Sequence, residues 1–207
     1  MKKSKIIKYI PFILIIIILI SCSQSPNKNE NQDLNKLDSI SGKKLIDNGF
    51  LKYADSLRLD SLKKEIIESF NIYDEDNNKF AFIDAEELSE FNFDFFMPEL
   101  NKILLKRGLK IKIEKASDYE MSNDIFINGQ EIKLYTKKEL ETEIFWDIAP
   151  RNFFKKVNDL LKENNIEERF YLLYGGNDLH TFLLTEKQFE IISDRLIAEK
   201  NGIPYLP

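Results

Sequence analysis

Three polar residues, Asp74, Asp76 and Asn78, have the spacing of the first three ligands in a calcium-binding EF-hand loop. A hard cation such as Ca²⁺ takes oxygen ligands of this kind. Two further requirements of that loop are missing, because Lys79 stands where the sharp turn needs glycine and Ala85 stands where a bidentate glutamate closes the site. We therefore interpret the segment as a solvated acidic loop, and we predict no metal and no other cofactor for the chain.

Residues 74–99 as a whole are strongly acidic, with nine acids against Lys79 alone. Acids near helix N-termini account for part of this excess, since the helix dipole stabilises negative charge there. We interpret the remainder as an acidic face that meets a basic protein partner. The candidate partner-binding residues are Asp74, Glu75, Asp76, Glu86, Glu87 and Glu90.

Cys22 is the only cysteine of the chain, and it follows a short leader. Four lysines precede an apolar run, residues 10–20, which has about half of the ~20 residues that a membrane-spanning helix needs. The leader ends in Leu19-Ile20-Ser21-Cys22, which resembles the lipobox of bacterial lipoproteins. The resemblance covers this segment only. It implies that residues 1–21 are a signal peptide and that Cys22 is acylated and starts the mature chain.

Lipid on Cys22 would hold the protein in the bacterial cell envelope, with the outer membrane favoured. A single acyl chain binds a bilayer only reversibly, whereas two or more anchor a protein stably. The resemblance implies several chains on Cys22, so the membrane is the first predicted partner. An uncleaved membrane anchor and plain secretion are the alternative interpretations of the leader.

Nucleophilic catalysis finds little support in this sequence. His180 is the only histidine, no G-x-S-x-G pattern is present, and Cys22 is assigned to the lipid. The segment Gly175-Gly176-Asn177-Asp178 fits a tight turn with positive φ, and a ligand-binding loop stays open as the alternative. The seven glycines form no phosphate-binding loop. We therefore predict that the chain is not an enzyme.

The charge balance excludes another class of partner. The chain has 30 basic and 35 acidic residues, and loss of the four leader lysines would leave 26 against 35, a net charge of −9. Nonspecific nucleic-acid binding needs clustered Lys and Arg, so no nucleic acid is expected as a partner. The mature chain also has no cysteine pair for a disulfide, so its stability must come from a core that contains many of the 16 phenylalanines.

Several local patterns predict where helices begin. Capping-box patterns start at Asp84, Thr136 and Thr185. Pro98 and Pro150 predict two more helix starts, because proline is favoured in the first helical turn. A further helix is expected over about residues 60–69, with another near residues 44–57.

Alternating and turn-flanked apolar segments predict the strands. Asn128-Gly129 is a strong hairpin signal, and Gly175–Asp178 joins a second pair of strands. We therefore expect an α+β fold with an antiparallel sheet of about five strands, built from hairpins, with helices packed mainly on one face. The expected strands are residues 79–83 (an edge strand), 109–114, 125–127, 132–135, 169–174 and 179–184.

Composition divides the chain into three parts. We predict a signal peptide over residues 1–21, a lipidated N-terminus and flexible polar tether over residues 22–43, and a single α+β domain over residues 44–207. The expected function is that of a lipid-anchored envelope protein with a non-catalytic binding or interaction domain. Two alternatives stay open: a toxin-neutralising, immunity-type lipoprotein with an acidic recognition face, and an envelope hydrolase that uses carboxylates.

Overall fold

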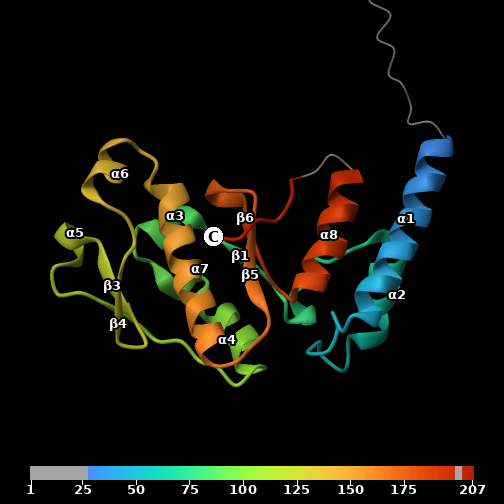
Figure 1. The fold of residues 1–207 in the computed structure, drawn as a ribbon, viewed down its shortest axis with the longest axis horizontal. Coiled ribbons are helices and arrows are strands. Elements are labelled where there is room, and N and C mark those ends of the chain that lie inside the picture. Colours follow the sequence, from blue (N-terminus) through green and yellow to red (C-terminus); the bar gives the residue numbers. More distant parts are fainter. Residues whose placement is uncertain (1–27, 199–201) are drawn as a thin grey trace, which may run out of the picture.

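The computed structural model describes residues 28–198 and 202–207, so the predicted signal peptide and Cys22 lie outside the described residues. The fold is α+β, as predicted, with two small antiparallel sheets among helices (Figure 1). The helices are α1 (Lys28–Asp47), α2 (Leu59–Ser69), α3 (Ala85–Ser89), α4 (Met97–Leu105), α5 (Tyr119–Ser122), α6 (Lys137–Glu141), α7 (Phe145–Glu163) and α8 (Glu186–Ala198). The strands are β1 (Phe80–Ile83), β2 (Ile113–Lys115), β3 (Asp124–Ile127), β4 (Gln130–Lys133), β5 (Arg169–Leu173) and β6 (Leu179–Leu184).

The sheet in the middle of the molecule has the strand order β1-β6-β5 (Figure 1). Both strand pairs are antiparallel, and Phe182 of β6 lies opposite Phe80 of β1 and Tyr171 of β5. Helix α8 covers one face, with α1 and α2 behind it, and α3 and α7 cover the other face (Figure 1). The prediction that helices pack mainly on one face is therefore wrong for this sheet.

The sequence of β5 explains why both faces are covered. Phe170 and Leu172 are buried on the side of α7, and Tyr171 and Leu173 are buried on the side of α8. A strand with apolar residues at successive positions must be covered on both faces. The sheet therefore separates two hydrophobic cores, one with α3, α4 and α7 and one with α1, α2 and α8.

Both predicted hairpins are present. Strands β3 and β4 are joined through Asn128 and Gly129, whose φ angles are 51° and 76°, as a type I′ turn requires. Strands β5 and β6 form the second hairpin, and β1 is an edge strand, as predicted.

The prediction of one sheet of about five strands is wrong, because β2, β3 and β4 form a separate sheet in the order β2-β3-β4. Residues before β2 are held by side-chain amides in place of a neighbouring strand. Ile111 N donates to Asn101 Oδ1 at 2.9 Å, and Asn101 Nδ2 donates to Ile111 O at 3.0 Å. Lys112 N donates to Asn128 Oδ1 at 2.8 Å. These bonds satisfy backbone groups that a wider sheet would have used.

The N-terminal boundary also differs from the prediction. Residues 28–43, which we expected to belong to a flexible tether, form most of α1. Asp38 is buried and forms an ion pair with Arg195 of α8, which places α1 in the domain. Gly42 lies where α1 meets α2, and a Cβ at this position would be 2.3 Å from Ile66 O. A polar helix can therefore be ordered by a buried ion pair and a close helix contact, which composition does not reveal.

Four of the predicted helix starts are confirmed. Asp84 caps α3 by accepting from Glu86 N and Glu87 N, and Pro98 lies in the first turn of α4. Thr136 and Glu139 form a complete capping box at α6, and Thr185 and Gln188 bond reciprocally at 3.2 and 3.3 Å before α8. Pro150, in contrast, lies inside α7, which begins at Phe145.

The extension of α7 upstream of the proline has a tertiary cause. The Phe145 ring packs against Tyr135 with a centroid distance of 5.1 Å.

Among the helices formed by residues 28–198, none combines the length and the hydropathy that a membrane span requires.

Candidate functional site

The acidic loop Asp74–Asp76 precedes β1, and two of its three acids contact Arg58. Asp74 accepts from Arg58 Nη2 at 2.8 Å and from the Asp76 backbone N–H at 2.9 Å. Asp76 lies 3.5 Å from Arg58 Nε, and Glu75 is exposed. The loop is therefore partly neutralised from within the domain.

The end of this loop is buried, which corrects the interpretation of a fully solvated segment. Asn77 Nδ2 donates to Ile72 O at 2.8 Å, and its Oδ1 accepts from Lys79 N at 2.7 Å. Asn78 Nδ2 donates to Tyr53 O at 3.1 Å. These residues serve the backbone of the turn. Across the described part of the chain, no three His, Cys, Asp or Glu side chains gather as a metal site would need.

The other three candidate acids lie on or just after α3, at the opposite end of β1. Glu86 and Glu90 are exposed, and Glu87 accepts a hydrogen bond from Asn92 Nδ2. The four residues of β1 span ~13 Å, so the two groups of acids are separate patches. The structure does not gather the six predicted residues at one point.

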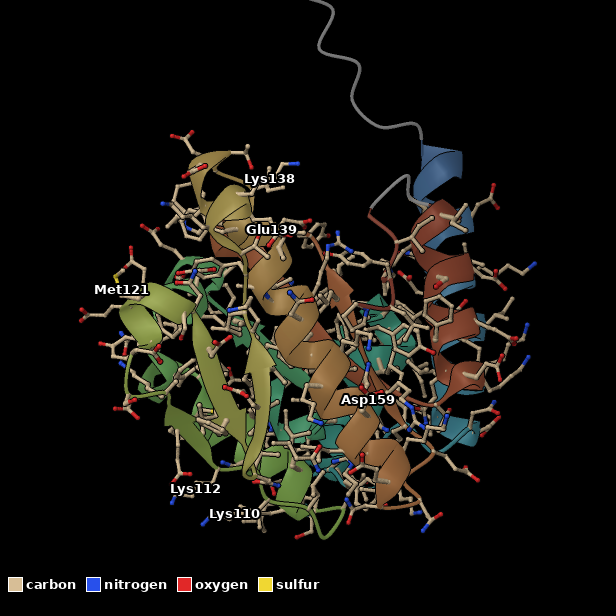
Figure 2. All side chains as sticks on the ribbon, turned by 60° about the vertical axis from the view of Figure 1, so that its left-hand side comes forward. Lys110, Lys112, Met121, Lys138, Glu139 and Asp159 are labelled. Atoms are coloured by element: carbon tan, nitrogen blue, oxygen red, sulfur yellow. The ribbon has the colours of Figure 1, made fainter. Side chains whose placement is uncertain are left out.

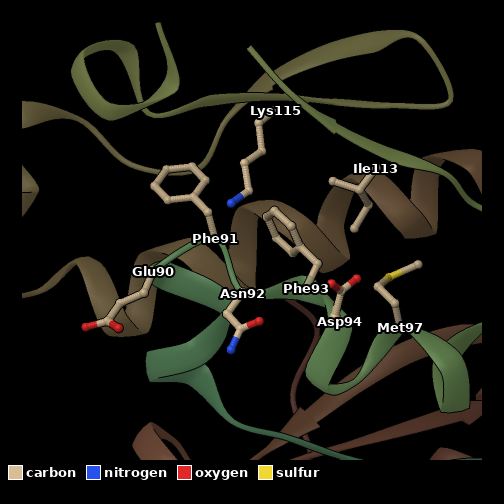
Figure 3. Close-up of a pocket in the computed structure, with 8 residues that line it drawn as sticks. All are labelled: Glu90, Phe91, Asn92, Phe93, Asp94, Met97, Ile113 and Lys115. Atoms are coloured by element: carbon tan, nitrogen blue, oxygen red, sulfur yellow. The ribbon is translucent and has the colours of Figure 1, made fainter. Parts of the chain in front are cut away.

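Glu90 borders an open groove of about 500 Å³, which we name the Phe91 groove (Figure 3). Phe91 and Phe93 are largely buried, and the charged groups of Asp94 and Lys115 lie at its sides. The groove is lined by Glu90, Phe91, Asn92, Phe93 and Asp94 from the segment between α3 and α4, by Met97 at the start of α4, and by Ile113 and Lys115 of β2.

Strand β2 is an edge strand, and the side chains of Ile113 and Lys115 extend from it into this groove (Figure 3). Asn128 N bonds Lys112 O, and Ala116 N bonds Asp124 O. Hydrogen-bonded pairs alternate in an antiparallel ladder, so Glu114 is the β2 residue that bonds β3. The backbone N–H and C=O groups of Ile113 and Lys115 point away from β3 and are available to an added strand.

A second cavity, the Lys79 pocket, has a volume of about 510 Å³ and lies where five chain segments meet. None of the six predicted site residues lines it. The residues that give the pocket its chemistry are Lys52, Tyr53, Lys79, Arg107, Glu168 and Gln188.

A buried ion network forms the inner wall of this pocket. Arg107 makes a bidentate contact with Glu168, with Nε to Oε2 at 2.8 Å and Nη2 to Oε1 at 3.0 Å. Lys79 Nζ also donates to Glu168 Oε1. The Arg107 guanidinium lies over the Tyr53 ring, 4.0 Å from its centroid. Two buried cations therefore share one buried carboxylate.

Burial and crowding of charge shift the titration of this network. Burial lowers the pKa of Lys79 from 10.5 to about 8, since the attraction of Glu168 offsets only part of the loss of hydration and Arg107 repels the ammonium. Burial alone would raise the pKa of Glu168, but the hydrogen bonds from Arg107 and the charge of Lys79 outweigh it and lower that pKa. The pocket therefore keeps Glu168 negatively charged. Lys79, with a pKa of about 8, loses its proton at mildly basic pH.

Sequence reasoning missed this pocket, although two signals were present. Lys79 is the one cation of the acidic stretch, but no local pattern in the sequence indicates that it is buried. Glu168 stands in a carboxylate pair with Glu167, a pattern too common in this chain to select a site. The two partners are 89 residues apart in sequence, so no local pattern links them.

His180 lies near the start of β6, the middle strand of the central sheet, in an aromatic cluster. Its ring lies 5.2–5.9 Å from those of Tyr73, Phe80, Phe82 and Tyr174. Burial lowers the pKa of His180, and the negative charge of Asp178 opposes part of that shift. These contacts give His180 a structural role in the packing of this cluster.

The loop after β5 turns through Gly176, whose φ of 60° suits glycine. This agrees with the tight turn predicted at Gly175–Asp178.

No protein-family model, curated protein or solved structure matches the chain. A functional proposal therefore rests on the leader sequence and on the geometry of the groove and the pocket.

Proposed function

We propose that this protein is a lipid-anchored protein of the bacterial cell envelope, and that its folded domain binds a basic protein partner without catalysing a reaction. The leader that ends in Leu19-Ile20-Ser21-Cys22 supports the anchor. The Phe91 groove beside the free edge of β2 is the observation that carries the binding proposal. A toxin-neutralising lipoprotein is one specific form of this proposal, because a basic toxin has the required charge.

The ordered start of α1 limits the distance between anchor and domain. Residues 22–27 precede the helix, and six extended residues span at most ~20 Å. An acyl group on Cys22 would therefore hold α1 close to the membrane surface. The domain would therefore bind its partner close to the membrane surface.

The groove combines features of a site that accepts an extended peptide. The outward backbone groups of Ile113 and Lys115 supply strand-pairing hydrogen bonds, which give affinity in β-strand addition. Phe91 and Phe93 supply an apolar floor for alternate side chains. Glu90 and Asp94 outnumber Lys115, the one cation of the lining, so the groove favours a peptide with basic residues, because complementary charge speeds association and orients the partner.

Metabolic labelling with a fatty-acid probe tests the anchor. Wild-type protein should be labelled and processed, whereas Cys22→Ala should lose the label and accumulate as a precursor. A Ser23→Ala variant is the matched control and should be labelled normally. Labelling of Cys22→Ala at the wild-type level would refute the anchor.

A synthetic peptide that alternates Val and Lys tests the groove. The double variant Glu90→Lys/Asp94→Lys should lower the association rate at low salt at least several-fold and reduce its salt dependence. The control Asp60→Lys/Glu68→Lys changes the same charge at exposed positions of α2 and should retain more of the wild-type rate. If both variants lost the same fraction of the association rate, the peptide would respond only to the net charge of the domain, and the proposal that the groove binds it would be overturned.

A further inference from the structure

The charges on the walls of the Lys79 pocket do not balance. Three cations, Lys52, Lys79 and Arg107, face two carboxylates, Glu167 and Glu168. Only Glu168 is buried, and it holds both buried cations. A buried cation is stable when a hydrogen-bonded anion compensates it. The inner wall of the pocket therefore keeps one positive charge in excess.

Arg107 makes four hydrogen bonds within the domain, and its planar guanidinium stacks on an aromatic ring. Beyond its two bonds to Glu168, its Nη1 donates to Asn78 O at 2.8 Å and to Ile103 O at 3.0 Å. Its planar group also stacks on Tyr53. Arg107 thus ties α4 to the start of β1, and this accounts for it as a structural residue.

Lys79 is different, because an ammonium group has three donors. Within the described residues, Nζ donates to Glu168 Oε1 and, at 3.3 Å, to Leu183 O. The side chain is 1% exposed and lines the pocket, and Nζ also lies 5.9 Å from the centroid of the Phe50 ring. Its third N–H group has no protein acceptor among the described residues and is therefore available to a ligand in the pocket.

We propose that the Lys79 pocket binds a small organic anion whose carboxylate or phosphate group accepts a hydrogen bond from Lys79 Nζ. The volume of about 510 Å³ exceeds that of the anionic group alone, and it lies in the usual range for small-molecule sites. Tyr53 and Ile166 offer apolar contacts for the rest of such a ligand. This site is independent of the proposed partner groove.

The titration of Lys79 agrees with an anion site. Its pKa of about 8 reflects burial, with attraction from Glu168 and repulsion from Arg107 and Lys52. A bound anion would supply the missing compensation and raise that pKa.

The test measures the melting temperature of the full chain, purified in detergent, with sodium acetate or sodium phosphate as the probe. Sodium chloride at equal ionic strength is the reference for each. We expect at least one probe to raise the melting temperature in a saturable manner, since a ligand that binds only the native state stabilises it. A rise with acetate alone identifies a carboxylate ligand, and a rise with phosphate alone identifies a phosphate ligand.

Lys79→Met removes the proposed donor and leaves the Arg107–Glu168 pair intact, so this variant should fold and lose the response. The control Lys110→Met removes a lysine that projects from the surface and does not line the pocket, and it should keep the response (Figure 2). A saturable response that persists in Lys79→Met would overturn the proposal, as would the absence of any response above chloride in the wild type.

A second measurement keeps the proposal testable if Lys79→Met does not fold. The charge of acetate is constant above about pH 6, so the pH dependence of its apparent dissociation constant reports the protein group. For a site that needs protonated Lys79, that constant should rise about 30-fold between about pH 7 and pH 9.5, following the protonated fraction. A constant that does not change over this range would overturn the role of Lys79.

Discussion

The acidic loop Asp74–Asp76 and the Lys79 pocket adjoin each other in sequence but lie in different environments. Arg58 and Asp74, which pair in the loop, have side chains that are 43% and 20% exposed. Lys79 and Glu168, which pair in the pocket, are 1% and 9% exposed. Both regions contain arginine–carboxylate contacts at 2.8 Å. Distance alone therefore does not distinguish them.

The difference shows that burial decides what a charge contributes. Water screens the exposed pair, so forming or losing it changes stability by at most about 1 kcal/mol. The buried network has lost that screening, and removal of one member leaves an uncompensated charge inside the protein. The loop can therefore vary its charges for recognition, whereas the pocket cannot do so without a compensating change.

The largest effect is expected for Glu168→Ala, which removes the only buried carboxylate of the network. The free energy of unfolding should fall by about 3–5 kcal/mol, because Lys79 and Arg107 lose their common partner. Urea unfolding checks this. The neighbouring variant Glu167→Ala removes an exposed acid and should stay within about 0.5 kcal/mol of the wild type. Similar losses in both variants would contradict the contrast between buried and exposed charge.

A smaller loss is expected for Asp38→Ala, at the buried pair that attaches α1 to α8. The free energy of unfolding should fall by about 2 kcal/mol, the contribution of hydrogen bonds to a charged group. Asp33→Ala on an exposed position of the same helix is the control and should have little effect. If Asp38→Ala were as stable as the control, the ion pair would not stabilise the domain, and this part of α1 would act as a tether.

The pH dependence of stability separates Lys79 from the exposed lysines. The folded-state pKa of Lys79, about 8, lies below its unfolded value of 10.5. The unfolded chain therefore binds more protons between these values, and stability must rise with pH across this window. Relative to Lys79→Met, the wild type should gain on the order of 1 kcal/mol between about pH 7 and pH 9.5. Parallel pH profiles of the two proteins would contradict the low pKa.

The smallest effect is expected for the acidic loop. Asp74→Asn, Glu75→Gln and Asp76→Asn together should lower the free energy of unfolding by about 1 kcal/mol or less, because Arg58 and its partners are solvated. Asn at position 74 also keeps an acceptor for the Asp76 backbone N–H. Glu75→Gln alone is the control and should change nothing measurable by thermal unfolding. A triple-variant loss near that of Glu168→Ala would show that the loop is as structural as the pocket.

Short-range patterns in the sequence predicted most of the local structure. Asn128-Gly129 imposes the left-handed backbone that a two-residue hairpin needs, and Thr136 with Glu139 satisfies a helix start by itself. Both results follow from atoms within four residues of each other, so the sequence contains the whole cause. The lipobox-like leader is also a short-range pattern, and the lipidation of Cys22 that it implies stays a prediction.

Long-range contacts decided the rest. The apolar residues of β5 were visible, but only the packed structure shows that helices cover both faces and that β2 belongs to a second sheet. Lys79 meets Glu168 across 89 residues, and Asp38 meets Arg195 across 157. Charged residues follow no periodic pattern from which such long-range ion pairs could be predicted. Whether a pair is buried depends on the surfaces that exclude water around it. The sequence by itself determined the hairpin turns and the helix caps, because their causes are local. The tertiary structure alone determined which charges are buried and where the groove and pocket lie.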